Sequence, residues 1–199
     1  KAVGLPEGTL SVDLIQMVRM VEDGVEVKMS KRTGNAITLH ELCEDLGVDA
    51  ARWFFVSKDV ATQMDLDLKQ ARTRDNNPVF YAQYAYSRMH SILNKEGTPA
   101  YVPVETFESL SDDKELRLMK LMSEFPNLVA SAAKDRKPNK ITEYIMEFVK
   151  LYHSYYNSVH VLNPDNEKLT NERLGLTKAC MITLRNALDL VGVDAPETM

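Results

Sequence analysis

Cysteine is scarce in this 199-residue chain, which contains only Cys43 and Cys180. The two residues lie far apart and lack the spacing of metal ligands, so we expect two buried, reduced thiols. No apolar run approaches the roughly 20 residues that a membrane-spanning helix needs. The amino terminus has no signal-peptide pattern, and residues 1–4 are typical of a chain cut within a longer sequence. The sequence therefore predicts a cytoplasmic protein that does not bind membranes.

An excess of positive charge is missing as well. The chain has 24 lysines and arginines against 29 aspartates and glutamates, which gives a net charge of −5. This balance does not indicate nucleic-acid binding, and we expect no DNA partner, but a local basic face could still bind RNA. Basic residues form two clusters, and a cluster of this kind is more often a solvated surface than a nucleic-acid site. These are Lys28, Lys31 and Arg32, and then Lys134, Arg136, Lys137 and Lys140.

The first extended segment is predicted to form a β-hairpin. Residues 14–21 are mostly apolar and β-prone, and residues 25–27 alternate between apolar and polar. Asp23 and Gly24 lie between the two runs, and an Asp-Gly pair in this position is a strong hairpin signal. The hairpin leads directly into the polar loop 28–35.

After this loop the pattern becomes helical. Thr38, with Glu41 three residues later, predicts a capping box for a helix that ends at Gly47. Asp49 is then expected to cap a second, shorter helix over residues 50–58.

The remainder of the chain is predicted to form a helical bundle. Asn77 as the N-cap and Pro78 at the first helical position predict a helix to about Asn94. Three further segments carry apolar residues at intervals of three and four, which is typical of helices that bury one face. Pro126 is expected to bend the first of them. The three stripes are Leu118, Leu121, Phe125, Leu128 and Ala132; Ile141, Ile145, Phe148, Tyr152, Tyr155 and Val159; and Leu174, Met181, Leu184, Leu188 and Val191.

The loop Lys28-Met29-Ser30-Lys31 is the segment best suited to phosphate chemistry. Two ammonium groups on a loop can follow the negative charge that develops on a leaving pyrophosphate, which stabilises a transition state. Lysine serves this purpose as a mobile point charge. Four residues alone are a weak signal, because short lysine-rich loops are common.

The surrounding residues resemble those of arginyl-tRNA synthetases, which are class I aminoacyl-tRNA synthetases. Residues 28–35 resemble the second class I signature motif, including the trailing Gly-Asn. Residues 47–55 resemble the Asp-Ala-Leu-Arg element that arginyl and cysteinyl synthetases share, with Ala51 in place of leucine. Further similarity covers most of the chain, although Thr198 departs from the usual arginine. These stretches are residues 64–68, 75–88, 148–162 and 195–199.

The resemblance implies a mainly α fold with two parts. Residues 1–60 would be the end of a class I catalytic domain, with the hairpin and the signature loop. Residues 61–199 would be a helical anticodon-binding domain. The implied reaction attaches L-arginine to its tRNA at the expense of ATP, through an arginyl-adenylate. The first signature motif and the arginine pocket are absent, so we expect this chain to be inactive alone.

The same resemblance implies roles for residues of the loop. Lys28 and Lys31 would hold ATP phosphates, and Lys31 would contact the transition state. Met29 and Ser30 would complete the ATP-binding loop, and Ser30 would help to close it. Mg²⁺ would arrive with the nucleotide, and no protein-bound metal is expected.

Arginine tRNA is the implied partner of the helical part. Helical spacing places Tyr81, Tyr84 and Arg88 on one face of their helix, away from the apolar stripe. The pattern alone favours packing of the tyrosines against a neighbouring helix, with Arg88 in a surface ion pair. The resemblance instead favours anticodon contact, because RNA bases stack on aromatic and guanidinium planes. The other expected tRNA-binding residues are His153, Tyr156, Asn157 and Met199.

Several alternatives remain at this point. His153 and His160 lie seven residues apart on one helix face, but no carboxylate or cysteine completes a zinc site. A cysteinyl-tRNA synthetase shares the signature loop but does not predict residues 77–85. A non-catalytic tRNA-binding protein would have no reason to keep the loop, and a plain helical scaffold would have no affinity for tRNA.

Overall fold

The predicted hairpin is part of a three-stranded sheet in the computed structural model of the chain, which describes residues 4, 6, 8–27, 37–74 and 77–199. β1 (Val18–Glu22) and β2 (Val25–Glu26) are antiparallel, with Asp23 and Gly24 between them, so the hairpin is confirmed. β3 (Met64–Asp67) pairs with β1 in parallel and was not predicted. Its Met-Asp-Leu-Asp alternation was the available signal, since Met64 and Leu66 are buried.

Two short helices follow the sheet's first two strands. α1 (Leu39–Leu46) begins with the predicted capping box, in which the Glu41 amide donates to Thr38 Oγ1 at 3.2 Å. α2 (Val48–Val56) begins directly after Gly47, so the prediction that Asp49 caps it is wrong. Asp49 lies in the first helical turn and its side chain accepts hydrogen bonds from distant residues instead. α3 (Leu68–Arg72) follows β3.

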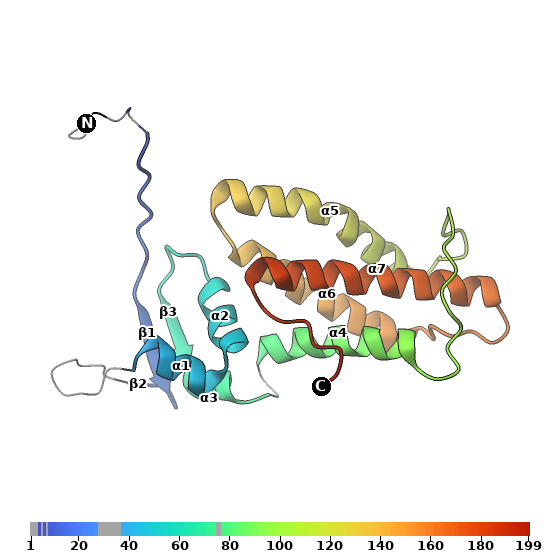
Figure 1. Cartoon of the computed structure of the whole chain (residues 1–199), viewed down its shortest axis with the longest axis horizontal. Helices are drawn as coiled ribbons and strands as arrows, with labels where there is room; N and C mark the ends of the chain where they lie inside the picture. Colours follow the sequence, from blue (N-terminus) through green and yellow to red (C-terminus); the bar gives the residue numbers. More distant parts are fainter. Residues whose placement is uncertain (1–3, 5, 7, 28–36, 75–76) are drawn as a thin grey trace.

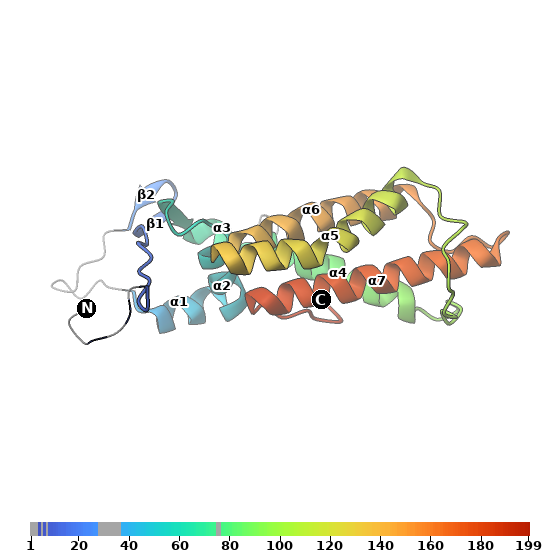
Figure 2. The ribbon, with the colours of Figure 1, turned by 90° about the horizontal axis from the view of Figure 1, so that it is seen from above.

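The bundle contains four long helices that run along one another in Figure 2. They are α4 (Pro78–Asn94), α5 (Asp113–Asp135), α6 (Asn139–Ser158) and α7 (Glu167–Val191). The predicted start of α4 is confirmed, because Asn77 Oδ1 accepts from the Val79 amide at 3.0 Å. The Asn77 side chain also donates to the carbonyl of Ala71 at 2.8 Å, which ties the start of α4 to α3. α5 continues through Pro126.

The predicted apolar stripes form the core. Every residue of the α6 stripe is buried, and Phe148, Tyr152 and Tyr155 are fully enclosed. In the α7 stripe only Met181 is half-buried. Trp53 of α2 is 2% exposed and joins the same core, and α2 contacts α4, α6 and α7. The sheet and the bundle therefore share a packed junction (Figure 1).

The two cysteines differ in burial. Cys180 is fully buried, and burial raises the pKa of its thiol, which keeps it protonated. Cys43 is only half-buried, so the expectation of two buried thiols is wrong for this residue.

Candidate RNA-binding face

An aromatic cluster lies where α4 and α6 pack against each other. We call it the aromatic face and define it as Tyr81, Tyr84 and Arg88 of α4 with His153 and Tyr156 of α6. Tyr81 is 38% exposed and Tyr84 is 45% exposed, so both lie outside the core as their spacing predicted. The His153 ring lies beneath them, with centroid distances of 4.7 Å to Tyr81 and 5.8 Å to Tyr84. Each ring thus packs on α6, as the pattern alone favours, and still presents surface to solvent, while anticodon contact stays a prediction.

Arg88 joins the two helices through its guanidinium group. The guanidinium carbon lies 4.1 Å from the ring centroid of Tyr156 and 5.2 Å from that of Tyr84. Such cation–π contacts contribute about 0.5–1 kcal/mol at exposed sites and hold a guanidinium plane in place. Arg88 is therefore positioned by two rings rather than by a carboxylate partner among the interactions that the structure describes.

His153, one of the residues expected to bind tRNA, is largely buried. The residue is 9% exposed, because α4 covers the side of α6 that the apolar stripe leaves open. Burial lowers the pKa of His153, and the neighbouring Arg88 lowers it further. Its Nε2 atom has no hydrogen-bond partner among the described residues. The ring is therefore a neutral support for the two tyrosines rather than a freely exposed RNA contact.

A pocket of about 350 Å³ opens beside this face and gathers several predicted residues. It contains Arg88 and Lys95 but no aspartate or glutamate side chain, although the chain as a whole is acidic. We call it the tail pocket because the C-terminal segment forms one wall. Its lining residues are Tyr84, Ser87, Arg88, Ser91, Ile92, Lys95, Tyr156, Thr198 and Met199.

Sequence reasoning missed Ser91 and Lys95, although a signal was present. Ser91 lies seven residues after Tyr84, and Lys95 lies seven residues after Arg88, so helical spacing returns both to the same face. Asn157, by contrast, does not line the tail pocket. It is exposed and lines an adjoining pocket of about 470 Å³, which shares Tyr156 and Lys95 with the first.

The basic residues predicted near position 136 are not a free surface. Arg136 pairs with Asp13 at 3.1 Å, and Lys137 pairs with Asp59 at 2.6 Å. Lys140 pairs with Asp135 at 2.5 Å. These carboxylates pair with three of the four predicted cations, and the pairs of Arg136 and Lys137 connect the α5–α6 turn to the N-terminal part of the chain.

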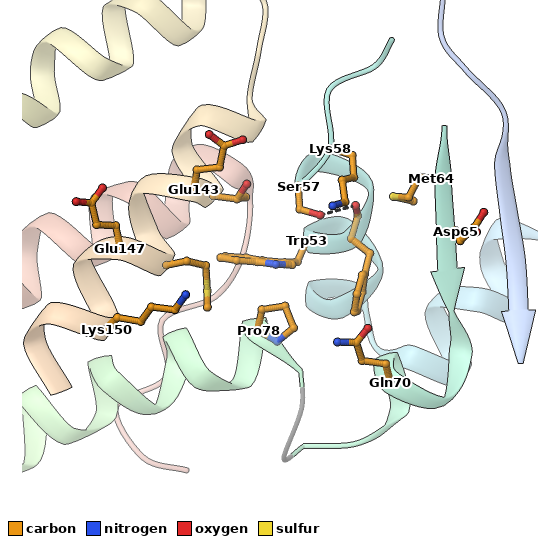
Figure 3. Close-up of a pocket in the computed structure, with 13 residues that line it drawn as sticks. Trp53, Ser57, Lys58, Met64, Asp65, Gln70, Pro78, Glu143, Glu147 and Lys150 are labelled. Atoms are coloured by element: carbon orange, nitrogen blue, oxygen red, sulfur yellow. Dashed lines mark hydrogen bonds between the residues drawn. The ribbon is translucent and has the colours of Figure 1, made fainter. Parts of the chain in front are cut away.

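A second large cavity, of about 670 Å³, lies at the junction between α2, β3 and α6 (Figure 3). Lys58 extends from the segment that follows α2, while Glu143, Glu147 and Lys150 extend from α6. Because the lining mixes both charges, it has no net attraction for a polyanion. The tail pocket is the better candidate for RNA.

The residues of the predicted ATP-binding loop cannot be placed relative to this pocket. Lys28, Met29, Ser30 and Lys31 lie outside the described residues. Within residues 8–27, 37–74 and 77–199 no group of three or more histidine, cysteine or acidic side chains gathers as metal ligands. The helices of these same segments include none long and apolar enough to cross a membrane.

Comparison with models of known protein families identifies the domain that contains this pocket. The model of the DALR anticodon binding domain matches residues 82–199, a range that includes the tail pocket and all of the aromatic face except Tyr81. The chain belongs to the DALR anticodon-binding domain family. In this family context, α4, α6 and the C-terminal segment are parts of the matched domain, whereas β1 to α3 precede it.

Relatives of this DALR-family chain match it along its whole length. An arginine–tRNA ligase of Bacillus pumilus is 44% identical over 203 residues, which cover 100% of this chain and 36% of the relative. An arginine–tRNA ligase of Staphylococcus carnosus is 44% identical over 199 residues, which cover 98% of this chain and 36% of the relative. The chain thus spans about a third of the length of these relatives. The resemblance to arginyl rather than cysteinyl enzymes is confirmed.

Solved structures agree with this assignment. An arginyl-tRNA synthetase of Thermus thermophilus matches with a TM-score of 0.65 and 28% identity, over 85% of this chain and 29% of that one. A structure from Campylobacter jejuni that is described as an arginyl-tRNA synthetase gives a TM-score of 0.79 and 25% identity, over 93% of this chain and 40% of that one. The mainly helical fold predicted from the sequence is confirmed.

Proposed function

We propose that this chain is the anticodon-binding part of an arginine–tRNA ligase, and that the tail pocket receives an unstacked anticodon base of arginine tRNA. The observation that carries the proposal is the composition of this pocket. Two tyrosines, an arginine and a lysine line it without a carboxylate side chain, in a chain of net charge −5. A polyanion that approaches an acidic protein binds best where negative side chains are absent.

The geometry suits a single-stranded RNA loop. A base can stack on the exposed faces of Tyr84 or Tyr156, and stacking of this kind contributes about 1–3 kcal/mol per base. Arg88, held between both rings, and Lys95 at the rim would neutralise adjacent phosphates. His153 would act from below by keeping the tyrosine rings in place, and Met199 would close the pocket at the tail. Asn157 would contact RNA from the adjoining pocket.

The proposed parent activity is the ATP-dependent attachment of L-arginine to its tRNA in the cytoplasm, with Mg²⁺ bound to the nucleotide. Lys28 and Lys31 would supply the charges that meet the ATP phosphates, and Met29 and Ser30 would complete their loop. We also propose the division of the chain at residue 60. Support for this wider activity comes from the arginine–tRNA ligase relatives, because they match the signature loop as well as the bundle.

Anisotropy with labelled arginine tRNA tests the RNA-binding proposal directly. Tyr84→Leu removes the stacking surface, so we expect the affinity to fall by about 5- to 150-fold, the equivalent of 1–3 kcal/mol. Tyr84→Phe keeps the ring and should bind nearly as wild type does. Arg88→Ala removes the proposed phosphate contact and should also lower the affinity. Arg117→Ala removes the same charge at an exposed position of α5 and serves as its control. Equal affinity for a tRNA with an altered anticodon, together with a harmless Tyr84→Leu, would refute the proposal.

The ATP-loop proposal is tested in the full-length enzyme by pyrophosphate exchange. Lys31→Ala should lower the rate of adenylate formation by about 100- to 1,000-fold, because a charge that meets the transition state acts mainly on turnover. Binding of ATP should change much less. If the variant lost ATP affinity and kept its turnover rate, Lys31 would be a ground-state anchor instead.

A further inference from the structure

The C-terminal tail, residues 193–199, leaves the end of α7 and crosses α4 (Figure 1). Its last two residues, Thr198 and Met199, form one wall of the tail pocket. The tail has no helix or strand of its own, so other contacts must fix its course. Those contacts come from α2 and α4.

The first contact joins α2, α4 and the tail at one point. Asp49 Oδ2 accepts a hydrogen bond from Gln83 Nε2 at 2.7 Å, and Asp49 Oδ1 accepts one from the Asp194 amide at 3.3 Å. Gln83 Nε2 also donates to the carbonyl of Asp194 at 3.0 Å. Gln83 is only 5% exposed, although it lies on the most polar face of α4. A buried amide in this position satisfies both partners and holds the tail backbone against α4.

The second contact lies one turn further along α2, at Arg52. α7 ends at Gly192, which has a φ of 67° and so adopts the left-handed conformation that glycine tolerates. A Cβ atom at Gly192 would come within 2.8 Å of Arg52 Cδ. The Arg52 side chain therefore packs on the residue from which the tail departs. Both polar residues of the Asp-Ala-Ala-Arg element thus contact the base of the tail.

The third contact lies closer to the pocket. Ser87, one turn after Gln83 on α4, donates to the carbonyl of Pro196 at 2.6 Å. His90 Nε2 lies 3.5 Å from a carboxylate oxygen of Glu197. The tail is therefore held at residues 194, 196 and 197, immediately before the two residues that form the pocket wall.

We propose that Asp49, Gln83 and Ser87 are positioning residues for RNA recognition, which set the tail wall of the anticodon pocket. Asp49 and Gln83 do so from outside the pocket, whereas Ser87 also lines it. The inference rests on the proposed function of that pocket. Asp49 belongs to α2, which precedes the matched domain, so this network connects the N-terminal part of the chain to the RNA site. A displacement of α2 would move Asp194 and, through it, the pocket wall.

A double-mutant cycle with a shortened tail tests this inference. The variants are Gln83→Leu and Ser87→Ala, each in the whole chain and in a form that lacks residues 195–199. Loss of the two hydrogen bonds that Gln83 donates, or of the one that Ser87 donates, should weaken arginine tRNA binding on the order of five- to tenfold in the whole chain. In the shortened form, the same variants should have no further effect, because the wall that they position is gone. Ser123→Ala, which removes a helix-internal bond on α5, is the matched control and should have no effect.

The salt dependence of binding separates positioning from direct contact with RNA. The slope of affinity against salt concentration should not change in Gln83→Leu, since no phosphate contact is lost. Equal losses with and without the tail would overturn the inference, as would wild-type affinity in both variants. If the proposed function itself is wrong, Tyr84→Leu will also bind as wild type does. A failure of the inference alone leaves Tyr84→Leu impaired.

Discussion

The N-terminal part of the molecule, from β1 to α3, is stabilised differently from the helical bundle. Its ion pairs lie at the surface, such as Arg19 with Asp65 at 2.7 Å and Lys69 with Asp23 at 2.5 Å. Large apolar side chains in the segment before β1 remain exposed. These are Leu10, Val12, Leu14, Ile15 and Met17. The bundle instead encloses its aromatic residues, and Phe148, Tyr152 and Tyr155 are fully buried.

This difference indicates where stability and recognition reside. The bundle buries apolar area and even carboxylates, so changes inside it should be costly. The N-terminal part also buries Leu42, Trp53 and Leu66, but its charge pairs are exposed and contribute little individually. The aromatic face therefore lies on the bundle, whose enclosed core suits a site that must hold aromatic rings in a fixed geometry.

The largest expected effect tests the buried charges of the bundle. Glu115 is fully buried, and its Oε1 accepts a hydrogen bond from Arg173 Nε at 2.7 Å. Arg173→Leu leaves this carboxylate without its cation, and we expect a loss of about 3–5 kcal/mol in the free energy of unfolding. Urea denaturation measures it. Adding Glu115→Gln to Arg173→Leu should restore part of the lost stability. If Arg173→Leu left the free energy of unfolding unchanged, the bundle would not be dominated by buried contacts.

A smaller effect is expected where a loop packs on α7. A Cβ atom at Gly175 would lie 2.6 Å from Tyr101 Cε2 and 2.9 Å from Phe107 Cε1. Gly175→Ala should therefore overpack this contact and cost about 1–3 kcal/mol, despite alanine's better helix propensity. Thermal unfolding provides the measurement. The combination with Tyr101→Ala should relieve the clash, and an increase in stability for Gly175→Ala alone would contradict the packing.

The buried His153 predicts a dependence on pH. Its pKa is lowered in the folded state, so the unfolded chain binds more protons below about pH 6.5. The contribution of neutral His153 to stability is thus fully present above that pH and is lost as the pH falls toward the folded-state pKa. His153→Phe should reduce the loss of stability between pH 7.5 and 5.5, as measured by urea midpoints. An unchanged pH profile would show that His153 does not titrate as proposed. Because only one titrating group is involved, we expect a smaller change in stability than for Arg173→Leu or Gly175→Ala.

The smallest effect is expected in the N-terminal part. Arg72 donates to Asp45 with Nη2 at 2.7 Å and also contacts Glu22, but its side chain is 41% exposed. A double-mutant cycle of Arg72→Ala and Asp45→Ala should give a coupling energy of about 0.2–1 kcal/mol, which high salt should reduce. A coupling as large as that of Arg173 with Glu115 would remove the contrast between the two regions.

The sequence by itself determined the features that depend on near neighbours. The turn at Asp23 and Gly24, the cap at Thr38 and the start of α4 at Asn77 each follow from side chains within a few positions, and all three were predicted. Helical periodicity likewise placed the core stripe of α6 and the exposed positions of Tyr81 and Tyr84. The division at residue 60 stays a prediction.

Only the tertiary structure decided the features that join distant residues. β3 adds to β1 across more than 40 positions, Asp49 meets Asp194 across 145, and α4 covers His153. The same holds for Arg136 and Lys137, whose partners Asp13 and Asp59 lie in the N-terminal part. Local pattern carries no information on such pairs, because each depends on how two elements pack once the chain has folded. The tail pocket is of this kind, since its walls come from α4, α6 and the C-terminal tail.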